Sequence, residues 1–172
     1  MILMSAFLLL AAPVAATKAP LSSYEPQTVA NWLQAEGYRA AIDPNKEEKE
    51  PSVGPIIRSS EGGVSFNIFF YNCTRKTKCE DVQFYVGWNY GDEKQPSAQL
   101  INQWNAQKRF TKAYLDNDGD PTLEMDVLFT NGKLDEASWR ENFDIFVDAL
   151  GEFQQSLNQE KKAGTSPQRS AT

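Results

Sequence analysis

The sequence predicts an α+β domain in which helices cover an antiparallel sheet, in the order α-β-β-β-β-α-β-β-α. Three observations support this prediction. Several segments alternate apolar and polar residues, as half-buried strands do. Three other segments carry apolar residues three and four positions apart, as amphipathic helices do. The strands follow one another in runs instead of alternating with helices, which favours an antiparallel sheet over a parallel one.

The N-terminal part is predicted to form one helix and one short strand. The helix is expected over 26–37, because Pro26 suits a first helical turn and Gly37 suits the position after the last one. Val29, Trp32 and Leu33 would share its apolar face. A short strand is expected at 38–42. The segment 43–55 is charged and bounded by prolines, which predicts a solvated connection.

The next region is predicted to form hairpins. A brief strand at 56–59 and a turn at 60–63 lead into strands at 64–72 and 82–90. Alternate residues of these two strands are expected to face the core: Val64, Phe66, Ile68 and Phe70, then Val82, Phe84, Val86 and Trp88.

The C-terminal half is predicted to contain a helix at 96–107, strands at 108–116 and 121–130, and a long final helix. That helix begins at about Asp135, and its apolar stripe comprises Trp139, Phe143, Phe146, Val147, Leu150, Phe153 and Leu157. The structured domain is therefore expected at 26–157, after a lead-in over 17–25. Residues 158–172 are polar and are predicted to form a flexible tail.

The composition limits the function. With 172 residues, 41% of them hydrophobic and 23% charged, the chain is expected to form one globular domain with a core. Its net charge of -6 argues against a nucleic-acid partner. The chain has no histidine, which excludes Ser-His-Asp and Cys-His catalysis and most zinc sites. No dinucleotide or phosphate-loop motif is present, so no cofactor is expected.

Residues 1–16, "MILMSAFLLLAAPVAA", are predicted to be a signal peptide. Their apolar run is too short to span a bilayer, and Val14 and Ala16 suit the residues before a cleavage site. A basic segment before the run is missing, which leaves a buried N-terminal helix or a membrane anchor as the alternative. The expected location is therefore periplasmic or secreted, without a stable membrane anchor.

The two cysteines, Cys73 and Cys79, are predicted to form a disulfide that closes the hairpin between the strands at 64–72 and 82–90. Two cysteines alone cannot complete a zinc site, and their spacing is not that of a C-x-x-C motif. A disulfide requires an oxidising compartment, in agreement with export. A pair of free cytosolic thiols is the alternative.

The acidic turn "DNDGD" offers Asp116, Asp118 and Asp120 as weak metal-ligand candidates. An EF-hand loop beginning at Asp116 would need glycine at its sixth position and glutamate at its twelfth, where the chain has Pro121 and Val127. Asp-Gly between two alternating strands is typical of a hairpin tip. We therefore predict a hairpin tip and no metal site.

Five residues are candidates for recognition of a partner. Trp88 and Tyr90 end a predicted strand and could anchor a partner, although packing at the rim of the core is the alternative. Asn102, Trp104 and Asn105 lie together on the predicted helix at 96–107. Their structural alternative is that the amides satisfy nearby backbone groups.

The run "FNIFFYNCTRKTKCEDVQFYVGW" and the later "INQWNAQKRFTKAYLDNDGDPTLEMDVLFTNGKLDEASW" resemble the YbjN family, whose members are labelled bacterial sensory-transduction regulators. The resemblance covers roughly 26–157. It implies a fold like that of type III secretion chaperones and no catalytic residues, since the family has no established site. Relatives by fold often dimerise and bind peptide segments. The signal-like N-terminus and the cysteine pair distinguish this chain from cytosolic members.

Taken together, the sequence predicts an exported, non-enzymatic protein-binding or chaperone-like module that acts through a sheet edge or a groove beside the helices. A protein or peptide is the expected partner, and a homodimer is a further expectation. The alternative is a sensor domain that responds to a small ligand or to a cation through the acidic hairpin.

Overall fold

The computed structural model describes residues 25–43, 54–75, 78–129 and 134–165, with side chains up to 163. Its elements are α1 (Pro26–Ala35), β1 (Ala41–Asp43), β2 (Ile56–Glu61), β3 (Val64–Tyr71), β4 (Asp81–Gly87), α2 (Ala98–Gln107), β5 (Lys112–Leu115), β6 (Pro121–Leu128) and α3 (Glu136–Thr165). The predicted α+β class and element order are confirmed. The predicted signal peptide at 1–16 lies outside the described residues, as does the lead-in before residue 25.

The six strands form one sheet in the order β1-β2-β3-β4-β6-β5, and every neighbouring pair is antiparallel. β1 to β4 follow the chain as consecutive neighbours. α2 then carries the chain past the position of β6, so that β5 forms the sheet edge and β6 returns between β4 and β5. β4 and β5 are consequently parallel to each other although they do not pair.

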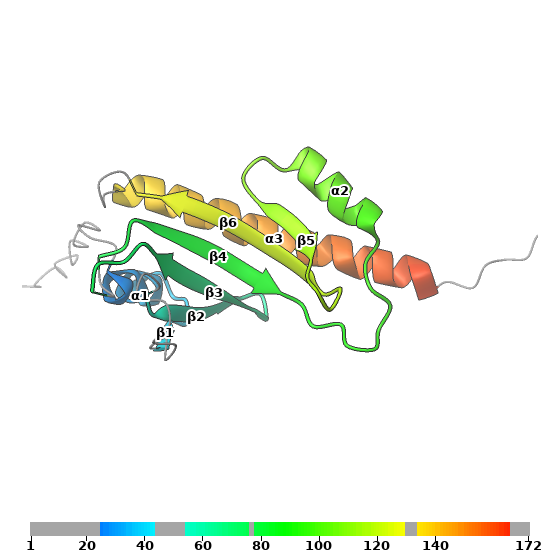
Figure 1. Ribbon diagram of the computed structural model, residues 1–172, viewed down its shortest axis with the longest axis horizontal. Coiled ribbons are helices and arrows are strands. Elements are labelled where there is room, and N and C mark those ends of the chain that lie inside the picture. Colours follow the sequence, from blue (N-terminus) through cyan, green and yellow to red (C-terminus); the bar gives the residue numbers. More distant parts are fainter. Residues whose placement is uncertain (1–24, 44–53, 76–77, 130–133, 166–172) are drawn as a thin grey trace, which may run out of the picture.

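All three described helices pack on the same face of the sheet (Figure 1). α3 runs along the strands, α1 contacts its first half, and α2 contacts its second half. Trp32 of α1 lies edge-on to Trp139 of α3, with ring centroids 5.9 Å apart. Phe84 of β4 stacks on Phe146 of α3 at 4.9 Å. Fully burying a side chain of this size contributes about 1.5–3 kcal/mol, and these rings form the centre of the core.

The helix ends follow local sequence signals. Beyond α1, Gly37 has a φ of 94°, and the N–H of Tyr38 donates to the carbonyl of Leu33 at 2.9 Å, as in a Schellman motif. The hydroxyl of Ser97 accepts the N–H of Leu100 at 3.2 Å and caps α2. The carboxylate of Asp135 accepts the N–H of Ser138 at 2.9 Å and caps α3.

Several boundaries differ from the sequence prediction. β4 ends at Gly87, so Trp88 and Tyr90 lie beyond the strand that was expected to contain them. β2 extends to Glu61, into the predicted turn. β1 is displaced to Ala41–Asp43, because the Schellman motif occupies the residues just before it. β5 is limited to Lys112–Leu115, because the chain must turn from α2 to the sheet edge over 108–111. α3 continues to Thr165, so the first half of the predicted flexible tail is helical.

The extension of α3 has a physical basis. Residues 159–163 are good helix formers, and Glu160 and Lys161 contact the segment that links β4 to α2. An apolar stripe alone could not reveal this part of the helix. Within the described residues, no helix is both long and apolar enough to cross a bilayer.

Candidate functional site: the open face of the sheet

Strand side chains that point away from the helices form a surface that we call the open face. Successive side chains of a strand alternate between the two faces, so each strand contributes every second residue. The strand register aligns one row across the whole sheet: Ala41, Arg58, Asn67, Tyr85, Glu124 and Lys112. Side chains of all six strands thus contribute to the open face.

Three aromatic rings form a group on this face. Phe69 lies edge-on to Tyr85 across β3 and β4, with centroids 5.6 Å apart, and stacks beside Tyr71 at 6.4 Å. All three side chains are half-buried. Leu128 of β6 points to the same face and is 77% exposed, one of two exposed large hydrophobic residues in the described chain. Aromatic and aliphatic groups left in contact with water are typical of a binding surface.

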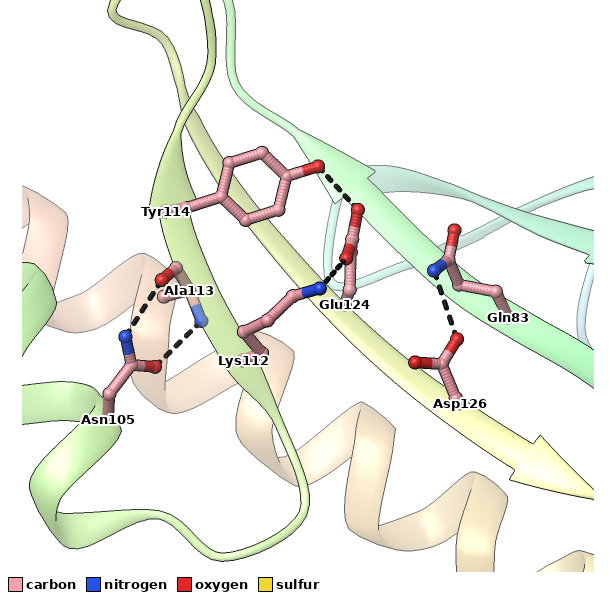
Figure 2. Close-up of polar contacts among 7 residues, drawn as sticks. All are labelled: Gln83, Asn105, Lys112, Ala113, Tyr114, Glu124 and Asp126. Carbon is pink, nitrogen blue, oxygen red and sulfur yellow. Dashed lines mark hydrogen bonds and ion pairs between the residues drawn. The ribbon is translucent and has the colours of Figure 1, made fainter.

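Glu124 is the centre of a polar network beside these rings (Figure 2). Its side chain comes from β6, and the residue is only 7% exposed. The hydroxyl of Tyr114 donates to one carboxylate oxygen, and the ammonium of Lys112 binds the other at 2.7 Å. Both partners come from β5, on which they flank Ala113. The carboxylate is thus held by two donors of one strand, as a buried charge requires.

This network is poorly suited to proton transfer near neutral pH. Burial, followed by the hydrogen bond to Glu124, raises the pKa of the Tyr114 phenol well above its ordinary value. The hydrogen bond to Glu124 likewise raises the pKa of the Lys112 ammonium. Both groups keep their protons in neutral solution, so neither can act as a general base there.

A second polar pair continues the network along β6. Gln83 of β4 donates from its amide to the carboxylate of Asp126 at 3.0 Å (Figure 2). This pair lies between Glu124 and the exposed Leu128 on the same strand. The open face therefore offers hydrogen-bonding groups next to apolar rings, and a protein segment could use both.

The open face is hollowed beside Gly87. The hollow has a volume of about 330 Å³, and polar side chains of Arg58, Ser65, Asn67, Tyr85, Asp116 and Asp120 contribute to its lining. A Cβ atom at position 87 would lie 3.2 Å from the hydroxyl oxygen of Tyr85. Glycine at this position therefore gives the tyrosine side chain room.

The acidic turn 116–120 is a hairpin tip between β5 and β6. The N–H of Gly119 donates to the carbonyl of Asp116 at 3.0 Å, and Gly119 has a φ of 81°. One carboxylate oxygen of Asp116 accepts the N–H groups of Asp118 and Asp120, both at 2.9 Å. Within the described residues no group of three or more potential ligand residues could hold a metal ion. The carboxylate of Asp116 thus stabilises the turn.

Asn105 closes the edge of the sheet at β5. Its side-chain amide donates to the carbonyl of Ala113 at 2.9 Å, and its carbonyl oxygen accepts the N–H of Ala113 at 2.9 Å (Figure 2). These two hydrogen bonds replace those that a neighbouring strand would form with the backbone of Ala113. The structural interpretation of this asparagine thus has direct support.

The other recognition candidates are placed differently. Trp88 and Trp104 both lie edge-on to Phe153 of α3, at 5.3 and 4.9 Å, so the fold brings them to one part of the core. The indole N–H of Trp88 donates to Gln154, and that of Trp104 donates to the hydroxyl of Thr111 at 3.2 Å. Tyr90 is half-buried and Asn102 is exposed. Their role in recognition stays a prediction.

Cys73 and Cys79 form a disulfide, with their sulfur atoms 2.02 Å apart. It joins the chain after β3 to the chain before β4. Both cysteines are buried, and Gly54, which precedes β2, packs directly on them. The disulfide lies at the end of β4 opposite to the linker that leads to α2.

In a comparison with protein-family models, one family model matches residues 25–159, which is more than half of the chain. The matching family is YbjN, described as "Putative bacterial sensory transduction regulator". The chain belongs to the YbjN family. The YbjN region begins just before α1 and ends within α3, so it contains the complete sheet. No curated protein and no solved structure matches the chain significantly. The likeness to type III secretion chaperones therefore stays a prediction.

The residues that form the open face were not predicted from the sequence. The alternation of strand residues predicts the side chains that face the core, and the open face consists of the positions between them. Phe69, Tyr71 and Tyr85 occupy those positions, where polar residues are usual. Aromatic residues at the solvent-facing positions of two paired strands were the available signal. The partnership of Glu124 with Lys112 and Tyr114 had no such signal, because it depends on the register of β5 and β6.

Proposed function

We propose that this chain is an exported, non-enzymatic protein-binding module of the YbjN regulator family, and that its open face is the binding surface. The observation that carries the proposal is the aromatic group of Phe69, Tyr71 and Tyr85 next to the polar network of Glu124. Rings supply contact area at low entropic cost, and neighbouring polar groups supply orientation.

The open face is favoured over the sheet edges. At β5, Asn105 already pairs with the outward N–H and carbonyl of Ala113, so an added strand would have to displace it. At the other edge, β1 has only three residues. Short or covered edges are poor templates for strand addition. A partner that lies across the face meets neither obstacle.

Two arguments support a non-enzymatic role. The chain lacks histidine, and the groups at the centre of the open face hold their protons at neutral pH. The family description names a regulator and no reaction. The cation-sensing alternative gains no support from the hairpin tip, because the carboxylates of Asp116 and Asp120 already accept backbone N–H groups.

Export is supported by the disulfide and by the apolar N-terminal run of the sequence. If the proposal is correct, the protein recovered from a cell that makes it has lost its first 16 residues and contains no free thiol. N-terminal sequencing and thiol titration after denaturation measure both. An intact N-terminus with two free thiols would contradict export.

The binding surface can be tested by photocrosslinking in cells. The crosslinking residue p-benzoylphenylalanine is placed at Phe69 or Tyr71 on the open face, and at Gln155, an exposed residue of α3, as the control. We expect a discrete protein adduct from the open face and none from Gln155. The change Phe69→Glu, combined with the crosslinker at Tyr71, should abolish the adduct.

Equal adducts from both faces would contradict the proposed surface, and so would adducts that survive Phe69→Glu in a folded chain. An adduct between two copies of the chain would show a homodimer instead of a foreign partner. Light scattering of the purified protein distinguishes these cases through the molar mass.

A further inference from the structure

The linker from β4 to α2 and the second half of α3 enclose a pocket, which we call the linker pocket. It has a volume of about 380 Å³, within the range of small-molecule sites. Tyr90 and Pro96 of the linker and Leu157 of α3 contribute its apolar wall. Charged side chains surround this wall.

The linker pocket is held open by specific contacts. The N–H of Ser97 donates to the carboxylate of Glu160 at 3.1 Å, and Glu93 forms an ion pair with Lys161. At the other end, the N–H of Tyr90 donates to Asp120 at 2.8 Å. These bonds fix the linker to α3 and to the hairpin tip, so the pocket exists before any ligand binds. A preformed pocket avoids the cost of ordering a loop on binding.

The charges of the linker pocket cancel. Its lining contains two acidic residues, Glu93 and Glu160, and two basic residues, Lys94 and Lys161. Burial raises the pKa of the Tyr90 phenol, and although Lys161 opposes this shift, the pKa stays above its ordinary value. The phenol is therefore neutral near pH 7. A charged ligand would lose its hydration without gaining a net opposite charge.

We propose that the linker pocket binds a small, uncharged ring compound that carries a hydrogen-bonding group. The ring would pack between Tyr90 and Leu157, and the polar group would reach the rim. The site goes beyond the proposed protein-binding function and shares no lining residue with the hollow of the open face. The two proposals can therefore fail separately.

The test uses three probes of one shape and different charge: 2-naphthalenemethanol, 2-naphthoate and 2-naphthylmethylammonium. Each is titrated into the full chain labelled with ¹⁵N, and amide chemical shifts are recorded by NMR at neutral pH. We expect the neutral probe to bind at least about tenfold more tightly than either ion. Its shifts should concentrate at residues 90–97 and 154–161.

A matched pair of variants tests the apolar wall. Tyr90→Ala removes a half-buried ring of the pocket, whereas Tyr71→Ala removes a half-buried ring of the open face. We expect Tyr90→Ala to weaken the neutral probe about tenfold and Tyr71→Ala to change its affinity less than about twofold.

Three results would overturn the proposal: tighter binding of an ion, shifts confined to other residues, or no binding of any probe at millimolar concentration. The wild-type titration decides these points even if Tyr90→Ala fails to fold. Tyr90→Phe then serves as the second variant, since it keeps the ring and removes only the hydroxyl.

Discussion

Asn105 and Asn102 show how differently one residue type can act on one helix. Both residues are exposed, but the side chain of Asn105 forms two hydrogen bonds with the backbone of Ala113. An edge strand presents unpaired backbone groups that can attract other chains. The amide of Asn105 satisfies both outward groups of the edge residue it faces, and it thereby ties α2 to the sheet.

Asn105→Ala should therefore lower the free energy of unfolding by about 1–3 kcal/mol, because it leaves two backbone groups of Ala113 without their partner. Asn102→Ala is the matched control and should change stability by less than about 0.5 kcal/mol. Urea unfolding followed by circular dichroism measures both. Equal effects of the two variants would show that the contact of Asn105 with Ala113 does not contribute measurably to the free energy of unfolding.

Tyr114 and Lys112 give the fold a dependence on alkaline pH. Their folded pKa values lie above the ordinary values of about 10 and 10.4. The unfolded chain therefore releases these protons first as the pH rises. The stability that they contribute is fully present below about pH 10 and is lost as the pH rises through the folded pKa values.

Tyr114→Phe should thus cost stability at neutral pH and reduce the alkaline loss. The difference in unfolding free energy between wild type and variant should be constant up to about pH 9 and shrink above about pH 10. Urea titrations at several pH values measure it. Tyr71→Phe, on the same face in β3, is the control. A difference that did not shrink in alkali would contradict the assigned contact with Glu124.

Gly151 and Gly54 differ in the space that surrounds the position of a Cβ atom. Gly151 lies in the interior of α3, and a Cβ there would meet no atom within 4 Å. Gly54 precedes β2, where a Cβ would lie 2.8 Å from the sulfur of Cys73 and 3.0 Å from the Cβ of Phe70. A substitution by alanine therefore meets no steric clash at position 151, whereas at position 54 it clashes with Cys73 and Phe70.

We expect Gly151→Ala to stabilise the chain by about 0.5–1 kcal/mol, because alanine loses less backbone entropy in a helix. Gly54→Ala should destabilise it by about 1–3 kcal/mol through overpacking against the disulfide. Thermal melting compares the two variants directly. If both moved the melting temperature in the same direction, the packing of Gly54 on the cysteines would be in question.

Tertiary contacts anchor the chain at both ends of β4: a disulfide before the strand and a hydrogen bond to α3 after it. The disulfide closes the hairpin between β3 and β4, and the linker beyond β4 is bound to α3 through Ser97 and Glu160. The aromatic core lies between these two ends. The disulfide closes a short loop of the unfolded chain, and this constraint stabilises the folded state.

The double change Cys73→Ala and Cys79→Ala should lower the free energy of unfolding by about 2–3 kcal/mol. A reducing agent should have a similar effect on the wild type and none on the double variant, which serves as the control. Urea unfolding with and without reductant measures this. Unchanged stability of the reduced wild type would show that the disulfide does not constrain the unfolded chain.

The sequence by itself determined the order of elements, the α+β class and the core. Alternation identified Phe66, Phe84 and Met125 as core-facing, and the spacing of apolar residues identified the stripe of α3. These predictions succeeded because they depend on local periodicity and on burial. The hairpin tip was predictable for the same reason, since its geometry is contained in a few adjacent residues.

Only the tertiary structure decided the remaining features. The position of β6 between β4 and β5 places Glu124 between Lys112 and Tyr85, and no local pattern encodes that register. The last turns of α3 are polar, so only their contacts with the linker explain them. The linker pocket likewise arises where segments distant in sequence meet. Local sequence patterns determined the helices and strands. Pairing between distant segments determined the open face and the linker pocket.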